Sequence, residues 1–201
     1  MKRSLISIAL VALLLPSGAE ALESPGKGGV TIVDGLPGWW HAGSNPTAFE
    51  VAVDRRVTHG GRASARLRSV APVPAGFGSL LQVASASRYR GKRVRLSAWL
   101  KTAAVTRHAG LWFRVDGPDQ DPQHALAFDA MANHPTWGTT DWHRCDLVFD
   151  VAPEAADVAF GVHLSGPGTI WADDFKIEVV DRSVPITRAS SSSPRNLDFE
   201  R

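Results

Sequence analysis

Two short segments of the chain carry tryptophan and arginine in a pattern that suits the binding of a polar ligand. In residues 93–102 and 110–117, apolar side chains occupy every second position, and Trp99, Trp112 and Arg114 lie between them. This alternation is typical of a β-strand with one buried face and one wetter face. The wetter face combines an aromatic surface for stacking with a guanidinium group for hydrogen bonding. The pattern therefore predicts a ligand-binding face.

Two more residues join this predicted site. His163 alternates with the apolar residues of another segment, which places it on the wetter face of that strand. Trp40 belongs to a Pro-Gly-Trp-Trp-His run at 37–41 that is typical of a loop, and loops carry function disproportionately. The predicted ligand-binding residues are Trp40, Trp99, Trp112, Arg114 and His163.

The same residues allow a purely structural interpretation. A loop or the tail could cover the wetter face, so that Trp99 and Trp112 form a second, smaller core, with Arg114 paired to Asp116 or another acid. Trp40 could likewise pack under a loop. Large aromatic side chains are common in cores as well as in sites, and both interpretations stay open.

The segments around these residues predict an all-β domain. Short alternating runs, separated by turns rich in Gly and Pro, follow one another across residues 30–181, and no long segment there has the 3.6-residue period of a helix. Many short strands with such turns are typical of a β-sandwich. We therefore expect one β-sandwich domain over residues 30–181.

Residues 1–21 have the features of a secretory signal peptide. Lys2 and Arg3 precede an apolar stretch, and Ala19-Glu20-Ala21 provides a small-x-small cleavage site. The apolar stretch is shorter than the roughly 20 residues that a membrane-spanning helix needs, although an uncleaved anchor is the alternative. We expect a secreted or periplasmic bacterial protein with no membrane span after cleavage.

Two segments that flank the domain are expected to be flexible. One is a lead-in at 22–29, and the other is a Ser-rich tail at 182–201. The tail contains a partly apolar stretch, Asn-Leu-Asp-Phe-Glu at 196–200. This stretch has two open interpretations: an edge strand that folds back on the sandwich, or the remnant of another module.

The composition argues against several kinds of partner and chemistry. Removal of residues 1–21 leaves 20 basic and 19 acidic residues, which are interspersed, so no nucleic-acid partner is expected. The single cysteine, Cys145, alternates with apolar residues and is expected to be a buried thiol rather than a nucleophile. The histidines lack zinc-site spacing, and no Gly-x-Ser-x-Gly motif occurs. The sequence therefore predicts no catalytic residues.

Four motifs resemble known jelly-roll domains. They are Gly-Lys-x-Val-x-Leu-Ser-Ala-Trp-Leu-Lys at 91–101, Thr-Thr-Asp-Trp at 139–142, Ile-Trp-Ala-Asp-Asp-Phe-Lys-Ile at 170–177 and Leu-Trp-Phe-Arg-Val-Asp-Gly at 111–117. The first three are similar to the carbohydrate-binding-module-like, galactose-binding-like jelly rolls of bacterial secreted proteins. The fourth is similar to a small domain family of unassigned role with this fold. The resemblance implies a β-sandwich jelly roll with a ligand site on the concave sheet face or in the edge loops.

The resemblance also implies a candidate metal site. Relatives of this type often hold a structural calcium ion near the closing strand, and Asp173 matches that position, with Glu50 as a weaker candidate ligand. Calcium takes six to eight oxygen ligands, some of which backbone carbonyls could supply. The alternative is an Asp173 carboxylate that accepts hydrogen bonds from backbone N–H groups or from an arginine. No other cofactor is expected.

The sequence thus predicts a secreted, non-catalytic domain that binds a carbohydrate or a similar polar ligand. Sugars offer apolar C–H patches for stacking and hydroxyl groups for hydrogen bonding. The alternative is a structural or protein-interaction domain of the cell envelope without a small-molecule site. A hydrolase on a jelly-roll scaffold is a third interpretation, for which the sequence nominates no acid, base or nucleophile.

Overall fold

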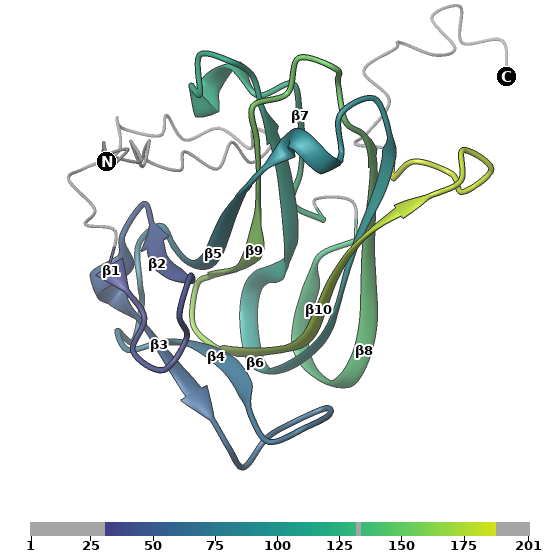
Figure 1. The fold of residues 1–201 in the computed structure, drawn as a ribbon. Helices are drawn as coiled ribbons and strands as arrows, with labels where there is room; N and C mark the ends of the chain where they lie inside the picture. Colours follow the sequence, from purple (N-terminus) through teal and green to yellow (C-terminus); the bar gives the residue numbers. More distant parts are fainter. Residues whose placement is uncertain (1–30, 132–133, 188–201) are drawn as a thin grey trace, which may run out of the picture.

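The described part of the chain consists almost entirely of β-strands (Figure 1). The computed structural model describes residues 31–131 and 134–187. The predicted signal peptide, the lead-in at 22–29 and the part of the predicted tail beyond residue 187 lie outside the described residues. The strands are β1 (Thr31–Ile32), β2 (Trp40–Gly43), β3 (Phe49–Asp54), β4 (Ser64–Ser69), β5 (Phe77–Ser85), β6 (Arg93–Asp116), β7 (Ala127–Asp129), β8 (Thr136–Asp150), β9 (Asp157–Ser165) and β10 (Thr169–Val180).

Three short 3-10 helices complete the regular structure of these residues: η1 (Pro46–Ala48), η2 (Ala86–Arg88) and η3 (Pro122–His124). None of the helices in the described ranges is long and apolar enough to cross a membrane.

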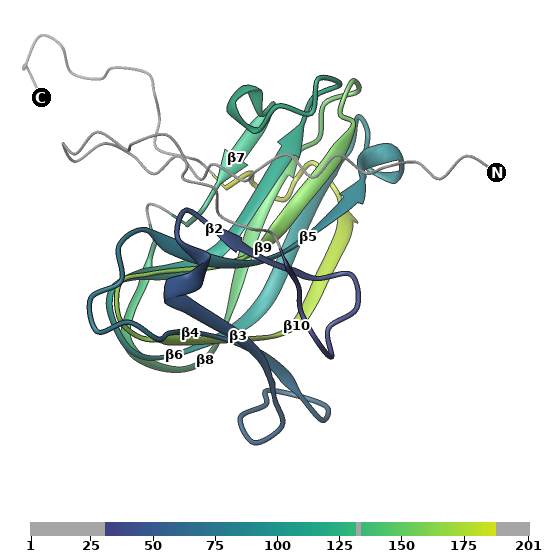
Figure 2. The same cartoon turned by 90° about the vertical axis from the view of Figure 1, so that its left-hand side faces the viewer.

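The strands form one antiparallel sheet that curls into two facing layers (Figures 1 and 2). The first layer has the order β1–β2–β5–β9–β6–β7, and the second has the order β3–β4–β10–β6–β8. Strand β6 belongs to both layers. The predicted all-β sandwich is therefore confirmed.

Strand β6 turns a corner between the two layers without a loop. Its first part pairs with β8 and β10, and its last part pairs with β9 and β7. Between these parts the register with β8 shifts, Ala104 has a φ of 52°, and Gly138 opposite Val105 has a φ of 71°. Such irregularities bend a strand and let it pass from one sheet layer to the next. The two segments predicted as separate strands, 93–102 and 110–117, are therefore the ends of one strand.

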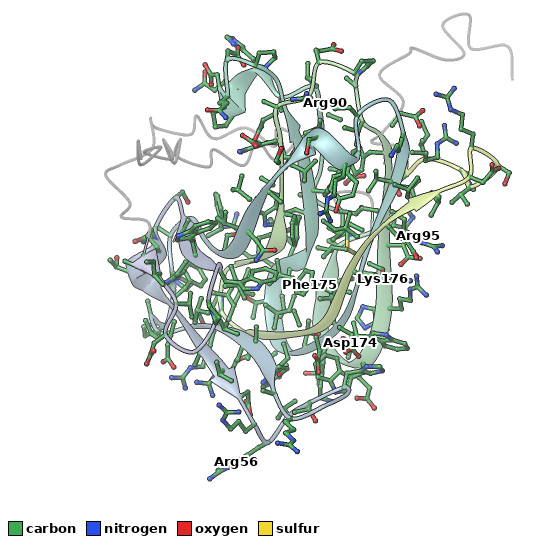
Figure 3. The ribbon with its side chains drawn as sticks, in the orientation of Figure 1. Arg56, Arg90, Arg95, Asp174, Phe175 and Lys176 are labelled. Carbon is green, nitrogen blue, oxygen red and sulfur yellow. The ribbon has the colours of Figure 1, made fainter. Side chains whose placement is uncertain are left out.

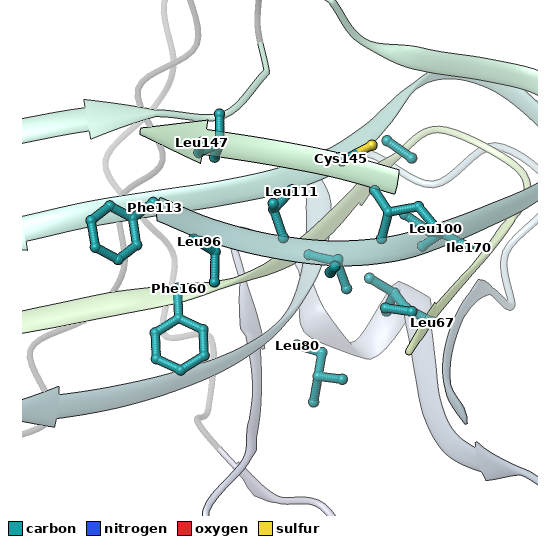
Figure 4. Packing of buried hydrophobic residues seen from close by; sticks show 14 of the residues in the cluster. Leu67, Leu80, Leu96, Leu100, Leu111, Phe113, Cys145, Leu147, Phe160 and Ile170 are labelled. Atoms are coloured by element: carbon teal, nitrogen blue, oxygen red, sulfur yellow. The ribbon is translucent and has the colours of Figure 1, made fainter. Parts of the chain in front are cut away.

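The main core lies between the layers and is built from the apolar side of each alternating strand. Figure 4 shows Leu80 and Phe160 of the first layer near Leu67, Leu96 and Leu100 of the second. Burial of such a side chain contributes about 1.5–3 kcal/mol. The single cysteine, Cys145, lies in this core as predicted, and burial raises the pKa of its thiol to about 12.

Candidate functional site

Four of the five predicted ligand-binding residues lie on the outer side of the first layer. The register places Trp40, Leu81, Gly161 and Trp112 in one row across β2, β5, β9 and β6. Neighbouring residues in a row are about 4.8 Å apart and project to the same side of the sheet. Arg114 and His163 lie two residues from this row, in opposite directions, and share its side. We call this surface the polar–aromatic face.

Trp112 occupies the centre of the polar–aromatic face. Its Nε1–H donates to Ser79 Oγ at 3.0 Å, and the Ser79 hydroxyl donates in turn to the Val162 carbonyl at 2.9 Å. Gly161, opposite Trp112, has no side chain to occupy the space beside the indole. A Cβ at Gly161 would lie 1.9 Å from the carbonyl oxygen of Leu80, so only glycine fits this close approach of two strands.

Arg114 forms a bidentate ion pair with Asp116. Its Nε and Nη2 donate to the two carboxylate oxygens of Asp116 at 2.7 and 3.0 Å. The third nitrogen, Nη1, is buried and has no hydrogen-bond partner. Asp116 thus fixes the guanidinium plane and leaves Nη1, with its two N–H groups, unpartnered.

His163 is the second residue of this face with an unused polar atom. Its Nε2 lies 3.1 Å from Nδ1 of His108, while its own Nδ1 is buried without a partner. Burial, with a smaller effect from His108, lowers the pKa of His163 to about 3, so the ring is neutral at pH 7. A neutral imidazole donates from one nitrogen and accepts at the other. Nδ1 can therefore pair with a hydroxyl group in either tautomer.

The predicted exposure of this face is wrong. Trp112 is 0% exposed, Arg114 4% and His163 1%. The reason is that both sides of β5 and β9 carry apolar residues, so the outer side has a small cluster of its own. The cluster comprises Ala42, Phe77, Leu81, Trp112, Ala130 and Ala159, with the partly buried Trp40, Val83 and Phe128 packed against it. A second core is thus present around Trp112, without Trp99, and so is the Arg114–Asp116 pair of the structural interpretation.

Trp99 does not belong to this face. It lies on the second layer, opposite Asp173 of β10 and Arg144 of β8. The corner in β6 separates it from Trp112, so the shared face predicted for the two tryptophans is wrong. The His59 ring stacks on Trp99 with centroids 3.9 Å apart, and His59 Nδ1 lies 2.7 Å from Asp174 Oδ2. Figure 3 shows Asp174 on β10, with Lys176 further along the strand.

The predicted calcium ligands do not fit a shared ion. Asp173 Oδ2 accepts the backbone N–H groups of His59 and Gly60, and Oδ1 accepts that of Asp174. Both oxygens of Glu50 are bonded to arginines, Arg66 and Arg68. The register puts Glu50 two strands and four residues from Asp173, roughly 10 Å across the sheet and 13 Å along it. Asp173 therefore takes the alternative role, a carboxylate satisfied by backbone donors.

Sequence reasoning missed three residues that organise these groups. Ser79 anchors Trp112, His108 contacts His163, and His59 covers Trp99. Each comes from a segment 33 or more residues away from its partner, so no local period connects them. The one available signal is that Ser79 is adjacent to Leu80, so on a strand the two side chains point to opposite sides of the sheet.

Comparison with known proteins relates the chain to a regulator from Bacillus subtilis (strain 168). No family model matches the chain. An "uncharacterized HTH-type transcriptional regulator", YbfP, is 43% identical over 171 residues, which cover 82% of this chain and 57% of the regulator. The chain therefore spans little more than half the length of that relative. A helix-turn-helix has no counterpart in residues 31–131 and 134–187, whose only helices are three-residue 3-10 turns.

Solved structures show the fold. The family 22 xylan-binding domain of Paenibacillus barcinonensis matches with a TM-score of 0.52 at 12% identity, covering 72% of this chain and 86% of that domain. A family 22 carbohydrate-binding module of Clostridium thermocellum matches with a TM-score of 0.50 at 13% identity and the same coverages. Tailspike protein 4 of bacteriophage CBA120 matches with a TM-score of 0.53 at 15% identity over 72% of this chain and 20% of the tailspike chain. The chain thus has the jelly-roll fold of carbohydrate-binding modules.

Proposed function

We propose that this domain is a non-catalytic binding module for a hydroxyl-rich ligand of the carbohydrate class, bound at the polar–aromatic face. The observation that carries the proposal is the pair of buried, unpartnered atoms on that face, Arg114 Nη1 and His163 Nδ1. Buried polar atoms in proteins are nearly always paired, because an unpaired one costs about 1–3 kcal/mol. A ligand that pairs with both atoms would recover this cost.

The spacing between Arg114 and His163 suits an elongated ligand. His163 is opposite Gly110, and Arg114 lies four residues further along β6, roughly 13 Å away. Trp112 lies between them, with the small side chains of Ala159 and Ser79 opposite Arg114 and His163. A sugar chain would place hydroxyl groups at both ends and apolar C–H groups over the indole.

The centre of the polar–aromatic face is closed to solvent, whereas Trp40, Val83 and Phe128 at its margin are only partly buried. We infer that the ligand enters at this margin. Trp40 is thereby retained as a ligand-binding residue, whereas Trp99 is not.

The relatives are consistent with a binding module used in different contexts. The structural neighbours include a domain named for xylan binding, and the Bacillus subtilis relative is named as a transcriptional regulator. A ligand-recognising domain would serve in either context. The predicted signal peptide leads us to propose that this chain acts outside the cytoplasm. The competing proposal is a structural or protein-interaction domain without a ligand.

An affinity gel series with soluble polysaccharides, xylan included, tests the proposal on residues 22–201. Arg114→Lys keeps a cation beside Asp116 but removes the planar fork with its free Nη1. Loss of one charged hydrogen bond of about 1.5–3 kcal/mol predicts affinity about 10- to 100-fold weaker. Trp99→Phe, on the other layer, is the matched control and should leave binding unchanged.

Two other outcomes would contradict the proposal. Weaker binding by Trp99→Phe with Arg114→Lys unaffected would move the site to the second layer. Failure of the folded wild-type domain to bind any polysaccharide would favour the structural or protein-interaction role. Circular dichroism of each variant establishes that it is folded.

A further inference from the structure

Strand β8 has a free edge. It pairs with β6 on one side, and no strand of the described residues lies on the other. Val148 points its N–H and C=O away from β6, because the N–H donates to Thr187 Oγ1 and the C=O accepts from Thr187 N–H, both at 2.9 Å. The register is regular here, so the backbone N–H and C=O groups of Asp146 and Arg144 also point away from β6. Such an edge is a template for another strand.

After β10, residues 182–187 run toward this edge. One nitrogen of Arg93, Nη1, donates to the carbonyls of Arg182 and Val184 at 2.7 Å each, while Nε and Nη2 bind the Asp150 carboxylate. Val184 and Asp150 are both bonded to Arg93, and three residues after Val184 the chain contacts Val148 through Thr187. It therefore runs opposite to β8, in the direction that an antiparallel strand would take.

A hollow of about 540 Å³ lies just beyond this point. It includes Asp146, only two residues, or about 7 Å, along β8 from Val148. Trp137, at its wall, is 70% exposed, so its indole offers an apolar surface for packing. Met131 and Pro135 add further apolar surface, and His134 and Arg144 supply nitrogen donors. Both ring nitrogens of His143 are already bonded, to the Asp141 carbonyl and to Thr136, and Arg144 Nε donates to Asp146.

We propose that the segment at 196–200, Asn-Leu-Asp-Phe-Glu, adds to the edge of β8 and fills this hollow. In an extended segment Leu197 and Phe199 share one side, and Asp198 and Glu200 share the other. The apolar pair matches Trp137 and its neighbours, and the acidic pair matches the nitrogen donors at the rim. The nine residues between Thr187 and Leu197 can span about 30 Å, more than the distance to the hollow.

Hydrogen exchange of the β8 amides tests this docking. We compare residues 22–201 with a chain that ends at Thr187 and with the double variant Leu197→Ser/Phe199→Ser. In both variants the amides of Arg144 and Asp146 should exchange at least about tenfold faster than in residues 22–201, because amides on an open strand edge are not protected from exchange. Ile186→Ser, an exposed apolar residue of the same tail, is the matched control and should exchange as wild type.

A synthetic peptide of residues 188–201 extends the test. Added to the chain that ends at Thr187, it should restore protection, and Trp137→Ala should abolish this effect. Equal exchange in the full chain and the Leu197→Ser/Phe199→Ser variant would overturn the proposal. Protection that depends on protein concentration, with a dimer in light scattering, would also overturn it, since a second copy would then supply the strand.

Discussion

At the scale of single residues, the chemistry of His163 is set by its surroundings rather than by its type. An unperturbed histidine titrates near 6.5, in the range where proteins use it as a switch. His163 is fully buried beside a second histidine, His108, whose own pKa is lowered by burial and by Arg107. A neutral imidazole is therefore built into the polar–aromatic face, where it can hydrogen-bond without carrying charge.

This burial predicts a loss of stability in acid. The pKa of His163 is about 3 in the folded state and about 6.5 in the unfolded state, so between these values the unfolded chain binds more protons. The free energy of unfolding should therefore fall as pH drops below 6.5, by about 1.4 kcal/mol per unit for one group. Urea unfolding at pH 7.5, 6.5, 5.5 and 4.5 measures the slope.

The variant His163→Gln isolates the contribution of His163. It removes this titration and leaves the other histidines whose pKa is lowered by partial burial, His41 and His108. The variant should lose stability less steeply than wild type between pH 6.5 and 4.5. Equal slopes for the two proteins would show that His163 does not titrate on unfolding as expected.

At the scale of elements, the tight pairing of β5 and β9 depends on Gly161. A Cβ there would lie 1.9 Å from Leu80 O and 2.8 Å from Leu81 Cα, both backbone atoms that cannot move alone. Gly161→Ala should therefore destabilise the domain by more than about 3 kcal/mol in urea unfolding, at the upper end of overpacking effects. Gly117→Ala, whose Cβ would meet Asp119 Oδ1 at 3.4 Å, is the control and should cost less than about 1 kcal/mol. Similar losses for both would refute the close approach.

The elements also show what the sequence could and could not predict. Alternation predicted most strand segments and the inward side of residues such as Leu96, Leu100 and Leu111, because period two is a local property. It could not assign strands to layers, since the corner in β6 turns the outer sides of Trp99 and Trp112 in different directions. One signal was available: no Gly or Pro interrupts residues 103–109, so nothing there indicates a turn between two strands.

Four of the five predicted residues share a face, but their arrangement was not predictable. Alternation places Trp112, Arg114 and His163 there, whereas Trp40, predicted in a loop, joins them because it lies on β2. Their burial depends on the apolar outer sides of β5 and β9, and the partners Ser79 and His108 come from distant segments. Such long-range contacts leave no periodic trace in the sequence.

At the scale of the whole molecule, β6 makes the two layers one cooperative unit. It supplies a central strand to both layers, and its side chains Leu96, Leu100, Leu111 and Phe113 all enter the common core (Figure 4). If β6 detached from either layer, the core that the two layers share would be exposed. Single domains of about this size usually unfold in one step.

We therefore expect residues 22–201 to unfold in urea as a two-state system. Tryptophan fluorescence reports on both layers, because Trp112 lies on the first and Trp99 on the second, whereas far-ultraviolet circular dichroism reports on strand content. The two probes should give one midpoint and one m-value. Gly161→Ala, which perturbs only the first layer directly, should shift both midpoints equally. If the fluorescence and dichroism transitions separate in wild type or in Gly161→Ala, the layers unfold independently and β6 does not couple them.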